Sequence, residues 1–151
     1  LAEVDLCLAD LRDAHLYGAN LRWAALKSAN LRGANLEGAN IRGADLYDAR
    51  VRRGDLNGAS GRGEDYEGAD LGVSDLRWAD LKRADLEGAD LSDANLTGAR
   101  LRGANLTNAD LSNADLHWVN LTQATLEEGD LRGAIHSKTT LPDGFKGGDN
   151  Q

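Results

Sequence analysis

Residues 84–108 read ADLEGADLSDANLTGARLRGANLTN and contain five copies of one five-residue pattern. Each copy begins with Ala, places a polar residue second and Leu third, and ends most often with Gly. The pattern extends in both directions without a change of phase. Leu occupies 23 of the 27 positions 1, 6, 11 and so on to 131, and Ala occupies 21 of the 27 positions from 4 to 134. A repeat of this regularity decides the fold.

A period of five matches neither the 3.6-residue period of an α-helix nor the two-residue period of a strand. Fixed-period repeats indicate a solenoid, in which each unit buries its apolar side chains by stacking on its neighbours. Leu and the Ala two residues before it share a face of a short extended segment. Gly two residues after the Leu suits a turn, and Asp or Asn before the Leu can hydrogen-bond to it. Each unit is therefore predicted to form one short side and one corner.

The pattern resembles that of the pentapeptide-repeat proteins. Units such as Ala34–Gly38 and Ala104–Asn108 carry the motif, which covers about residues 4 to 135. The resemblance implies an all-β fold, a right-handed quadrilateral β-helix with four units in each coil and about 6–7 coils in this chain. At about 4.8 Å per coil, the rod would be roughly 31 Å long.

The expected organisation is a β-helix over residues 1–135, a cap over 136–145 that covers the last coil, and a flexible tail at 146–151. Open coil ends expose backbone edges that favour association. We therefore predict a homodimer through an open coil end, with the first coil and its Cys7 and Leu8 as the candidate face. The alternative is that an N-terminal cap or domain has been removed.

The repeat has one irregular coil, in which Gly61 and Tyr66 stand at consecutive Leu positions. The first interpretation is an exchange of volume, with Tyr66 filling the space that Gly61 leaves open. Glu64 stands at an inward Ala position, where an unpaired carboxylate is costly. We therefore expect a local bulge that brings Glu64 to the surface, and the alternative interpretation is that this bulge is a contact site.

Stacking at intervals of 20 residues predicts columns of charge on the outer surface. A basic column is formed by Arg22, Arg42, Arg62, Lys82 and Arg102. An acidic column, expected on a neighbouring corner, is formed by Asp70, Asp90, Asp110 and Asp130. The columns either screen each other on a solvated surface or form a docking face for a partner of complementary charge.

All three tryptophans, Trp23, Trp78 and Trp118, stand two residues after a core position, so we expect them outside the core. Trp78 and Trp118 share a side two coils apart, and His117 precedes Trp118. Exposed Trp is enriched at binding hot spots, but a Trp can also lie flat along a corner and cover backbone. Both interpretations remain open at this point.

The composition restricts the classes of function. The net charge of −8 and the pI of about 4.8 argue against direct binding of nucleic acid. A single cysteine favours a reducing compartment, here the cytoplasm, and no apolar run reaches the length of a membrane span. Three scattered histidines give no metal-ligand spacing, so we expect no metal, no cofactor and no catalytic residues.

The leading hypothesis is a non-catalytic scaffold, a rigid rod that binds an unidentified partner protein through its outer faces. The alternative is a DNA mimic that inhibits or protects DNA gyrase or topoisomerase, which the resemblance implies for the fluoroquinolone-resistance branch of the family. B-DNA of this length would carry about 18 charges, against −8 for this chain, and the basic column would interrupt the negative surface.

Overall fold

The five-residue unit folds as a short inward-facing segment followed by a tight turn. In the unit of Leu31, the backbone N–H of Ala34 donates to the carbonyl oxygen of Leu31 at 3.0 Å. Between these two residues Gly33 has a φ of 71°, and the equivalent residue of nearly every described unit also has a positive φ. Because a Cβ is disfavoured at this backbone angle, Gly is the commonest choice for the corner.

The polar residue before each Leu supports the same turn. Its side-chain oxygen accepts a hydrogen bond from the backbone N–H two residues later, as between Asn35 Oδ1 and the N–H of Glu37 at 3.0 Å. The same bond joins Asp45 Oδ1 to the N–H of Tyr47 at 3.0 Å. The predicted bond from Asp or Asn to the turn backbone is thus confirmed.

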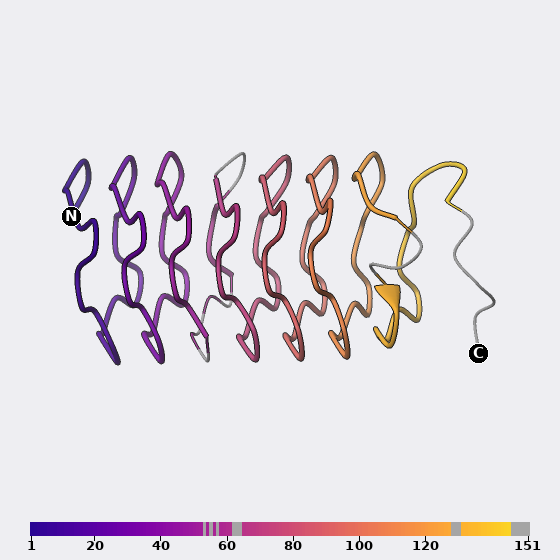
Figure 1. Cartoon of the computed structure of the whole chain (residues 1–151), viewed down its shortest axis with the longest axis horizontal. Helices are drawn as coiled ribbons and strands as arrows, with labels where there is room; N and C mark the ends of the chain where they lie inside the picture. Colours follow the sequence, from indigo (N-terminus) through magenta and orange to yellow (C-terminus); the bar gives the residue numbers. More distant parts are fainter. Residues whose placement is uncertain (53, 55, 57, 62–64, 128–130, 146–151) are drawn as a thin grey trace.

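Four such units complete one coil of a right-handed quadrilateral β-helix (Figure 1). The structure is a computed structural model that describes residues 1–52, 54, 56, 58–61, 65–127 and 131–145. Residues 20 apart pair as parallel bridges, from Asp5 with Ala25 to Asn120 with Thr140. Over these ranges no α-helix occurs, and each side contributes a single bridging residue rather than a longer strand.

The four sides are numbered here by their core positions. Side 1 holds core positions 1, 21, 41 and so on, and side 2 holds 6, 26 and 46. Side 3 holds 11, 31 and 51, and side 4 holds 16, 36 and 56. The residue two after each core position forms the edge to the next side, so that Trp23 lies on edge 1/2 and Trp78 on edge 4/1. Sides 1 and 3 are opposite each other, as are sides 2 and 4.

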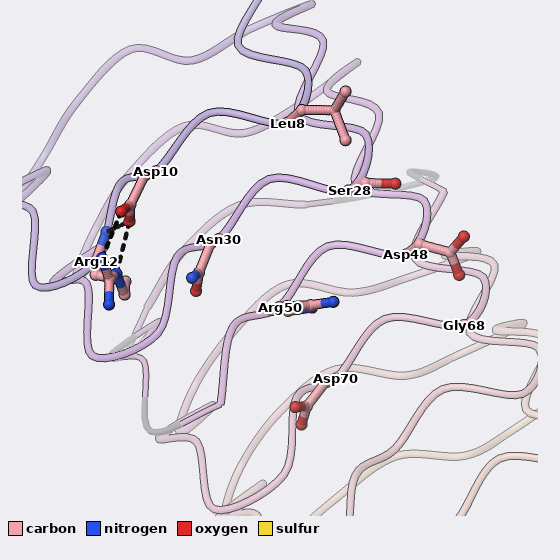
Figure 2. A pocket seen from close by; sticks show the side chains of 9 residues that line it. All are labelled: Leu8, Asp10, Arg12, Ser28, Asn30, Asp48, Arg50, Gly68 and Asp70. Carbon is pink, nitrogen blue, oxygen red and sulfur yellow. Dashed lines mark hydrogen bonds and ion pairs between the residues drawn. The ribbon is translucent and has the colours of Figure 1, made fainter.

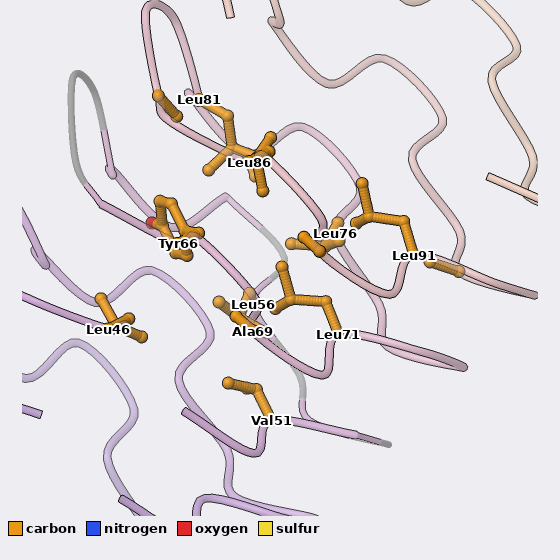
Figure 3. Close-up of a cluster of buried hydrophobic side chains, with 14 of the residues drawn as sticks. Leu46, Val51, Leu56, Tyr66, Ala69, Leu71, Leu76, Leu81, Leu86 and Leu91 are labelled. Carbon is orange, nitrogen blue, oxygen red and sulfur yellow. The ribbon is translucent and has the colours of Figure 1, made fainter. Parts of the chain in front are cut away.

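The core is a stack of Leu and Ala side chains inside the coils (Figure 3). From Leu21 to Leu121 the apolar residues at the core positions expose at most 1% of their surface. Each fully buried Leu contributes about 1.5–3 kcal/mol relative to an exposed one. Since no unit can bury its own Leu alone, the stacking of coils supplies the stability of the fold.

The irregular coil keeps the phase of the repeat because Gly61 and Tyr66 exchange volume. Tyr66 is fully buried, and its Oη occupies the place that a Cβ on residue 61 would take. Gly61 therefore provides room for a larger neighbour on the adjacent side, as the first interpretation of the sequence predicts. Glu64 and its expected bulge lie outside the described residues.

The last described units continue the coil through Thr140. His136 stands at a core position of side 4, and Thr139 donates a side-chain hydrogen bond to the carbonyl oxygen of Leu116. Leu141 and Phe145 are half-buried against the core. The role of residues 136–145 as a cap stays a prediction, and the expected tail lies outside the described residues.

Candidate protein-interaction surfaces

Edge 4/1 presents two exposed tryptophans in equivalent environments. Trp78 and Trp118 expose 63% and 58% of their surface. They stand in the matching stretches DLRW at 75–78 and DLHW at 115–118. These units are two coils apart, so their attachment points are separated by about 10 Å.

The rings on this edge pack along the rod onto the next corner. The ring of Trp78 occupies the space that a Cβ on Gly98 would need. Lys138 Nζ lies 4.2 Å from the centroid of the Trp118 ring in a cation–π contact. Each ring therefore covers backbone or a neighbouring side chain while more than half of its surface stays in solvent. Local cover of the corner and contact with a partner are thus compatible roles for these residues.

A carboxylate holds the side chain that precedes each of these tryptophans. Arg77 Nη2 donates to Asp75 Oδ2 at 2.6 Å, and this pairing lowers the pKa of Asp75. His117 Nδ1 lies 2.6 Å from Asp115 Oδ1. Burial raises the pKa of Asp115, but hydrogen bonds from the backbone and ring of His117 outweigh it, so the net shift is downward. The polar neighbours of both tryptophans are thus fixed in place.

The third tryptophan lies on edge 1/2. Trp23 exposes 61% of its surface, and its ring occupies the space beside Gly43 on the next coil. It is therefore one side away from Trp78 and Trp118 and does not join them in one patch.

Side 1 carries the basic column. Arg22, Arg42 and Arg102 are exposed, Lys82 Nζ lies 3.7 Å from Asp80 Oδ2, and Arg62 lies outside the described residues. Arg102 Nε donates to Gln123 Oε1 at 3.2 Å. The outward neighbours of Arg22 and Arg42 in their own units are Asn20 and Asn40, which bring no opposing charge.

The acidic column of Asp70, Asp90 and Asp110 lies on side 3, opposite the basic column; Asp130 lies outside the described residues. The expectation of a neighbouring position was wrong, because units ten residues apart in a four-unit coil occupy opposite sides. Arg52 Nη1 bridges Asp70 at 3.3 Å and Asp90 at 2.9 Å. Its guanidinium fills the space beside Gly72, which lacks a Cβ. The single charge of Arg52 therefore partly offsets the two carboxylates that it contacts.

Side 2 carries a second group of carboxylates. Its members are Asp45, Asp65, Glu67, Asp85 and Glu87. Loss of hydration raises the pKa of Glu67, and the charges of Asp65, Glu87, Asp85 and Asp48 raise it further. Side 2 is thus the side on which like charges crowd most closely.

A shallow groove follows edge 2/3 across the first four coils (Figure 2). Its walls are one row of edge residues, Leu8, Ser28, Asp48 and Gly68, and one row of side-3 residues, Asp10, Asn30, Arg50 and Asp70, with Arg12 at one end. Arg12 binds both oxygens of Asp10, which lowers the pKa of that carboxyl. Because charges of both signs line this groove and Arg12 is paired with Asp10 within it, the groove does not indicate a ligand of either charge.

The described part of the chain contains no cluster of three or more potential metal ligands among His, Cys, Asp and Glu. A search of the same residues finds no helix long and apolar enough to cross a membrane. The outer surface consists of straight columns of side chains, in which equivalent positions recur once in each coil.

A family model described as pentapeptide repeats matches residues 1–24, 19–58, 67–98, 74–113 and 99–135, with eight copies. The chain belongs to the pentapeptide-repeat family. Pentapeptide-repeat proteins are in general structural repeat proteins rather than enzymes. The matches leave residues 59–66 uncovered, which is where the core pattern is broken by Gly61 and Tyr66. No curated protein matches the chain.

Solved pentapeptide-repeat proteins share the fold. HetL, involved in heterocyst differentiation regulation in the cyanobacterium Nostoc sp. strain PCC 7120, is 33% identical over 95% of this chain and 70% of its own, with a TM-score of 0.50. Rfr23 from the cyanobacterium Cyanothece 51142 is 28% identical over 73% of this chain and 65% of its own, with a TM-score of 0.58.

A trypsin-treated form of QnrB1, a plasmid-mediated fluoroquinolone resistance protein, is 22% identical to this pentapeptide-repeat chain. The match covers 92% of this chain and 77% of the other, with a TM-score of 0.53. At this identity the likeness extends to the fold alone.

Several residues that shape edge 4/1 are missing from the sequence-based candidates. Asp75 and Asp115 fix Arg77 and His117, Gly98 accepts the Trp78 ring, and Lys138 stacks on Trp118. The duplicated stretches DLRW and DLHW were the available signal for the two aspartates. Alignment at intervals of 20 could have paired Lys138 with Trp118, but position 138 falls beyond the region assigned to the repeat.

Proposed function

We propose that this pentapeptide-repeat protein is a non-catalytic scaffold that binds a partner protein at edge 4/1. The observation that carries the proposal is the pair of exposed tryptophans, Trp78 and Trp118, on one straight edge. Large aromatic side chains supply much of the energy at protein interfaces. A rigid rod that presents two of them at a fixed spacing loses little conformational entropy on binding.

The surroundings of the two rings support this role. Arg77 and His117 are each held by a carboxylate, and Trp118 is stacked with Lys138. Polar groups arranged beside aromatic anchors resemble the polar rim of an interface. The basic column on side 1 begins at the same edge, so positive charge lies next to the two rings.

The test is affinity capture from the source organism with three proteins. Trp78→Ala/Trp118→Ala is expected to bind the partner more than tenfold more weakly than the parent protein does. The variant should therefore recover much less of that partner. Trp23→Ala is the matched control, since it removes an equally exposed Trp from a different edge. Equal recovery by the parent and the double variant would remove edge 4/1 as the binding surface.

A cytoplasmic location also belongs to this proposal, and a homodimer through an open coil end, with a mass of about 32 kDa, twice the 16.1 kDa of one chain, is the alternative to a side-by-side assembly of copies. The single cysteine, Cys7, is exposed and free, which suits a reducing compartment. A chain mass measured in solution tests the dimer, and fractionation of the source cells tests the location.

Mimicry of DNA toward a gyrase or topoisomerase is the second candidate, and the acidic side 2 favours it. The basic side 1 interrupts the negative surface, and the acidic column on side 3 is partly neutralised by Arg52. A supercoiling assay with micromolar protein tests it. Unchanged supercoiling would eliminate mimicry and leave the edge 4/1 proposal unaffected.

A further inference from the structure

Sides 1 and 2 are adjacent and carry opposite charges. Side 1 bears Arg22, Arg42, Lys82, Arg100 and Arg102 against the single acidic residue Asp80 over its described positions. Side 2 bears Asp5, Asp45, Asp65, Glu67, Asp85, Glu87 and Glu127 against the single basic residue Lys27. The two sides meet at edge 1/2, where Trp23 is exposed.

Most of these charges have no neutralising partner on their own side. Within the described residues Arg22 and Arg42 form no ion pair, although their backbone N–H groups are bound by Asn20 and Asn40. On side 2 the carboxylates stack directly above one another, as the bridges from Asp45 to Asp65 and from Asp65 to Asp85 show. Like charges stacked at about 5 Å repel and favour a cationic partner.

The spacing of the two columns identifies the partner. Both columns rest on the same parallel bridges, so basic and acidic groups recur at one interval, about 4.8 Å. A second copy of this chain therefore presents carboxylates level with Arg42 and Lys82. The coils of Arg22 and Arg102 carry no carboxylate on side 2, so the pairing is confined to the middle of the rod. The phosphates of B-DNA, about 3.4 Å apart along each strand axis, do not share this interval.

We propose that the chain assembles with further copies of itself, with side 1 of one rod against side 2 of the next. When the rods are parallel and not shifted, Arg42 of one copy faces Asp45 of the next. Lys82 likewise faces Asp85 and Glu87. The same coil of each copy thus supplies both members of a pair.

The contact is heterologous, because two different surfaces meet, and such contacts form closed rings when the rotation between copies allows it. Adjacent sides of a four-sided rod are a quarter turn apart. Four copies therefore close into a square bundle, in which each copy uses sides 1 and 2 and leaves sides 3 and 4 open. Edge 1/2 lies on the bundle axis, so the four exposed Trp23 rings meet there and are buried.

Edge 4/1 lies on the outer face of this bundle, where side 1 of one copy ends beside edge 2/3 of the next. Assembly is measured on the purified protein without any partner, whereas the proposed scaffold function is measured by recovery of a partner. A negative result for assembly therefore does not contradict the scaffold function, and a failure to recover a partner does not contradict assembly.

The first measurement is the mass of the purified full chain by size-exclusion chromatography with light scattering. At about 0.01 M salt, where charges act over about 30 Å, we expect about 64 kDa, four times the 16.1 kDa of one chain. At about 1 M salt, where the screening length is about 3 Å, the tetramer fraction should fall more than tenfold. A mass of one chain at low salt would overturn the proposal.

Charge reversal identifies the surfaces. Arg42→Glu/Lys82→Glu and Asp45→Lys/Asp85→Lys each reverse the charge at the two coils where the contact pairs basic with acidic groups. Like charges then meet at both points, so each variant alone should be monomeric at low salt. An equimolar mixture should recover the tetramer mass, because every contact then pairs an acidic copy with a basic one. The control Arg32→Glu/Arg132→Glu makes the same change in net charge on side 3 and should leave the tetramer unchanged.

Two further outcomes contradict the proposal. An oligomer that survives reversal of side 1 would show that the copies meet elsewhere, for example end to end. Two reversed variants that remain monomeric when mixed, while circular dichroism shows both to be folded like the parent, would show that these sides do not pair.

Discussion

The coil from Gly61 to Asp80 and the coil from Leu81 to Arg100 have the same backbone bridges over their described residues but differ in how closely they follow the repeat. The later coil has Leu at all four core positions. The earlier coil has Gly61 and Tyr66 at two of them, Val73 at a corner and Ser74 at an Ala position. The comparison teaches that the coil tolerates unusual residues as long as volume and hydrogen bonds are conserved.

Ser74 shows how a polar residue is accepted in the core. It is buried, and its Oγ donates to the carbonyl oxygen of Val51 at 2.9 Å. A buried hydroxyl is costly only when it lacks a partner. The earlier coil thus replaces apolar contact by a hydrogen bond at one position and by an exchange of volume at another.

The largest effect is expected from opening a cavity in the regular coil. Leu96→Ala removes a fully buried side chain and should lower the free energy of unfolding by about 3–5 kcal/mol, measured by urea denaturation. Leu76→Ala, on the same side of the irregular coil, is the matched variant and should cost the same within about 1 kcal/mol. A much smaller cost at Leu76 would mean that the irregular coil is already loosely packed.

The exchange between Gly61 and Tyr66 predicts the next effect. Gly61→Ala places a Cβ where the Tyr66 Oη lies and should destabilise the fold by about 1–3 kcal/mol. Gly61→Ala/Tyr66→Phe removes the hydroxyl and should recover part of this loss, with a coupling of about 1 kcal/mol in a double-mutant cycle. Strict additivity of the two substitutions would contradict the exchange.

The corners differ in backbone strain. Val73 is β-branched with a φ of 56°, an angle that costs an L-residue about 1–2 kcal/mol. Val73→Gly should therefore stabilise the protein by about 0.5–1 kcal/mol after the entropy cost of Gly. Gly88→Val is the reverse change at an open corner of the regular coil, with a φ of 63° and no neighbour within 4 Å. It should destabilise, and a shift of the same sign for both substitutions would reject strain as the cause.

The smallest effect concerns the ion pair of the irregular coil. Asp75→Asn keeps a side-chain oxygen for the N–H of Arg77 but removes the charge. The cost should be below about 1 kcal/mol, since Arg77 is 46% exposed. The folded pKa of Asp75 is lowered, so this stability is present above pH about 4 and is lost as the pH falls through the lowered pKa. Urea midpoints of parent and variant should differ at pH 6 and converge in acid.

The sequence predicted the family and the four-sided coil through the resemblance of its five-residue motif to a known family. It predicted the outward tryptophans from their position two residues after a core position. It also predicted that Tyr66 fills the space of Gly61, since retained phase excludes a shift of register. It placed the acidic column of Asp70 on a neighbouring side, which the four-sided coil corrected. The pairing of Arg52 with that column was not predicted, because it joins residues 18 and 38 apart and depends on Gly72 having no Cβ.

By itself, then, the sequence determined the coil, because the same turn and the same inward Leu and Ala recur in most of the described units. Only the tertiary structure decided how the long side chains lie on its surface: Trp78 over Gly98, Trp118 beneath Lys138, and Arg52 between Asp70 and Asp90. The physical reason is distance in sequence. The turn is built from neighbours within five residues, whereas the surface is built from side chains one or two coils apart whose rotamers depend on each other's space and charge.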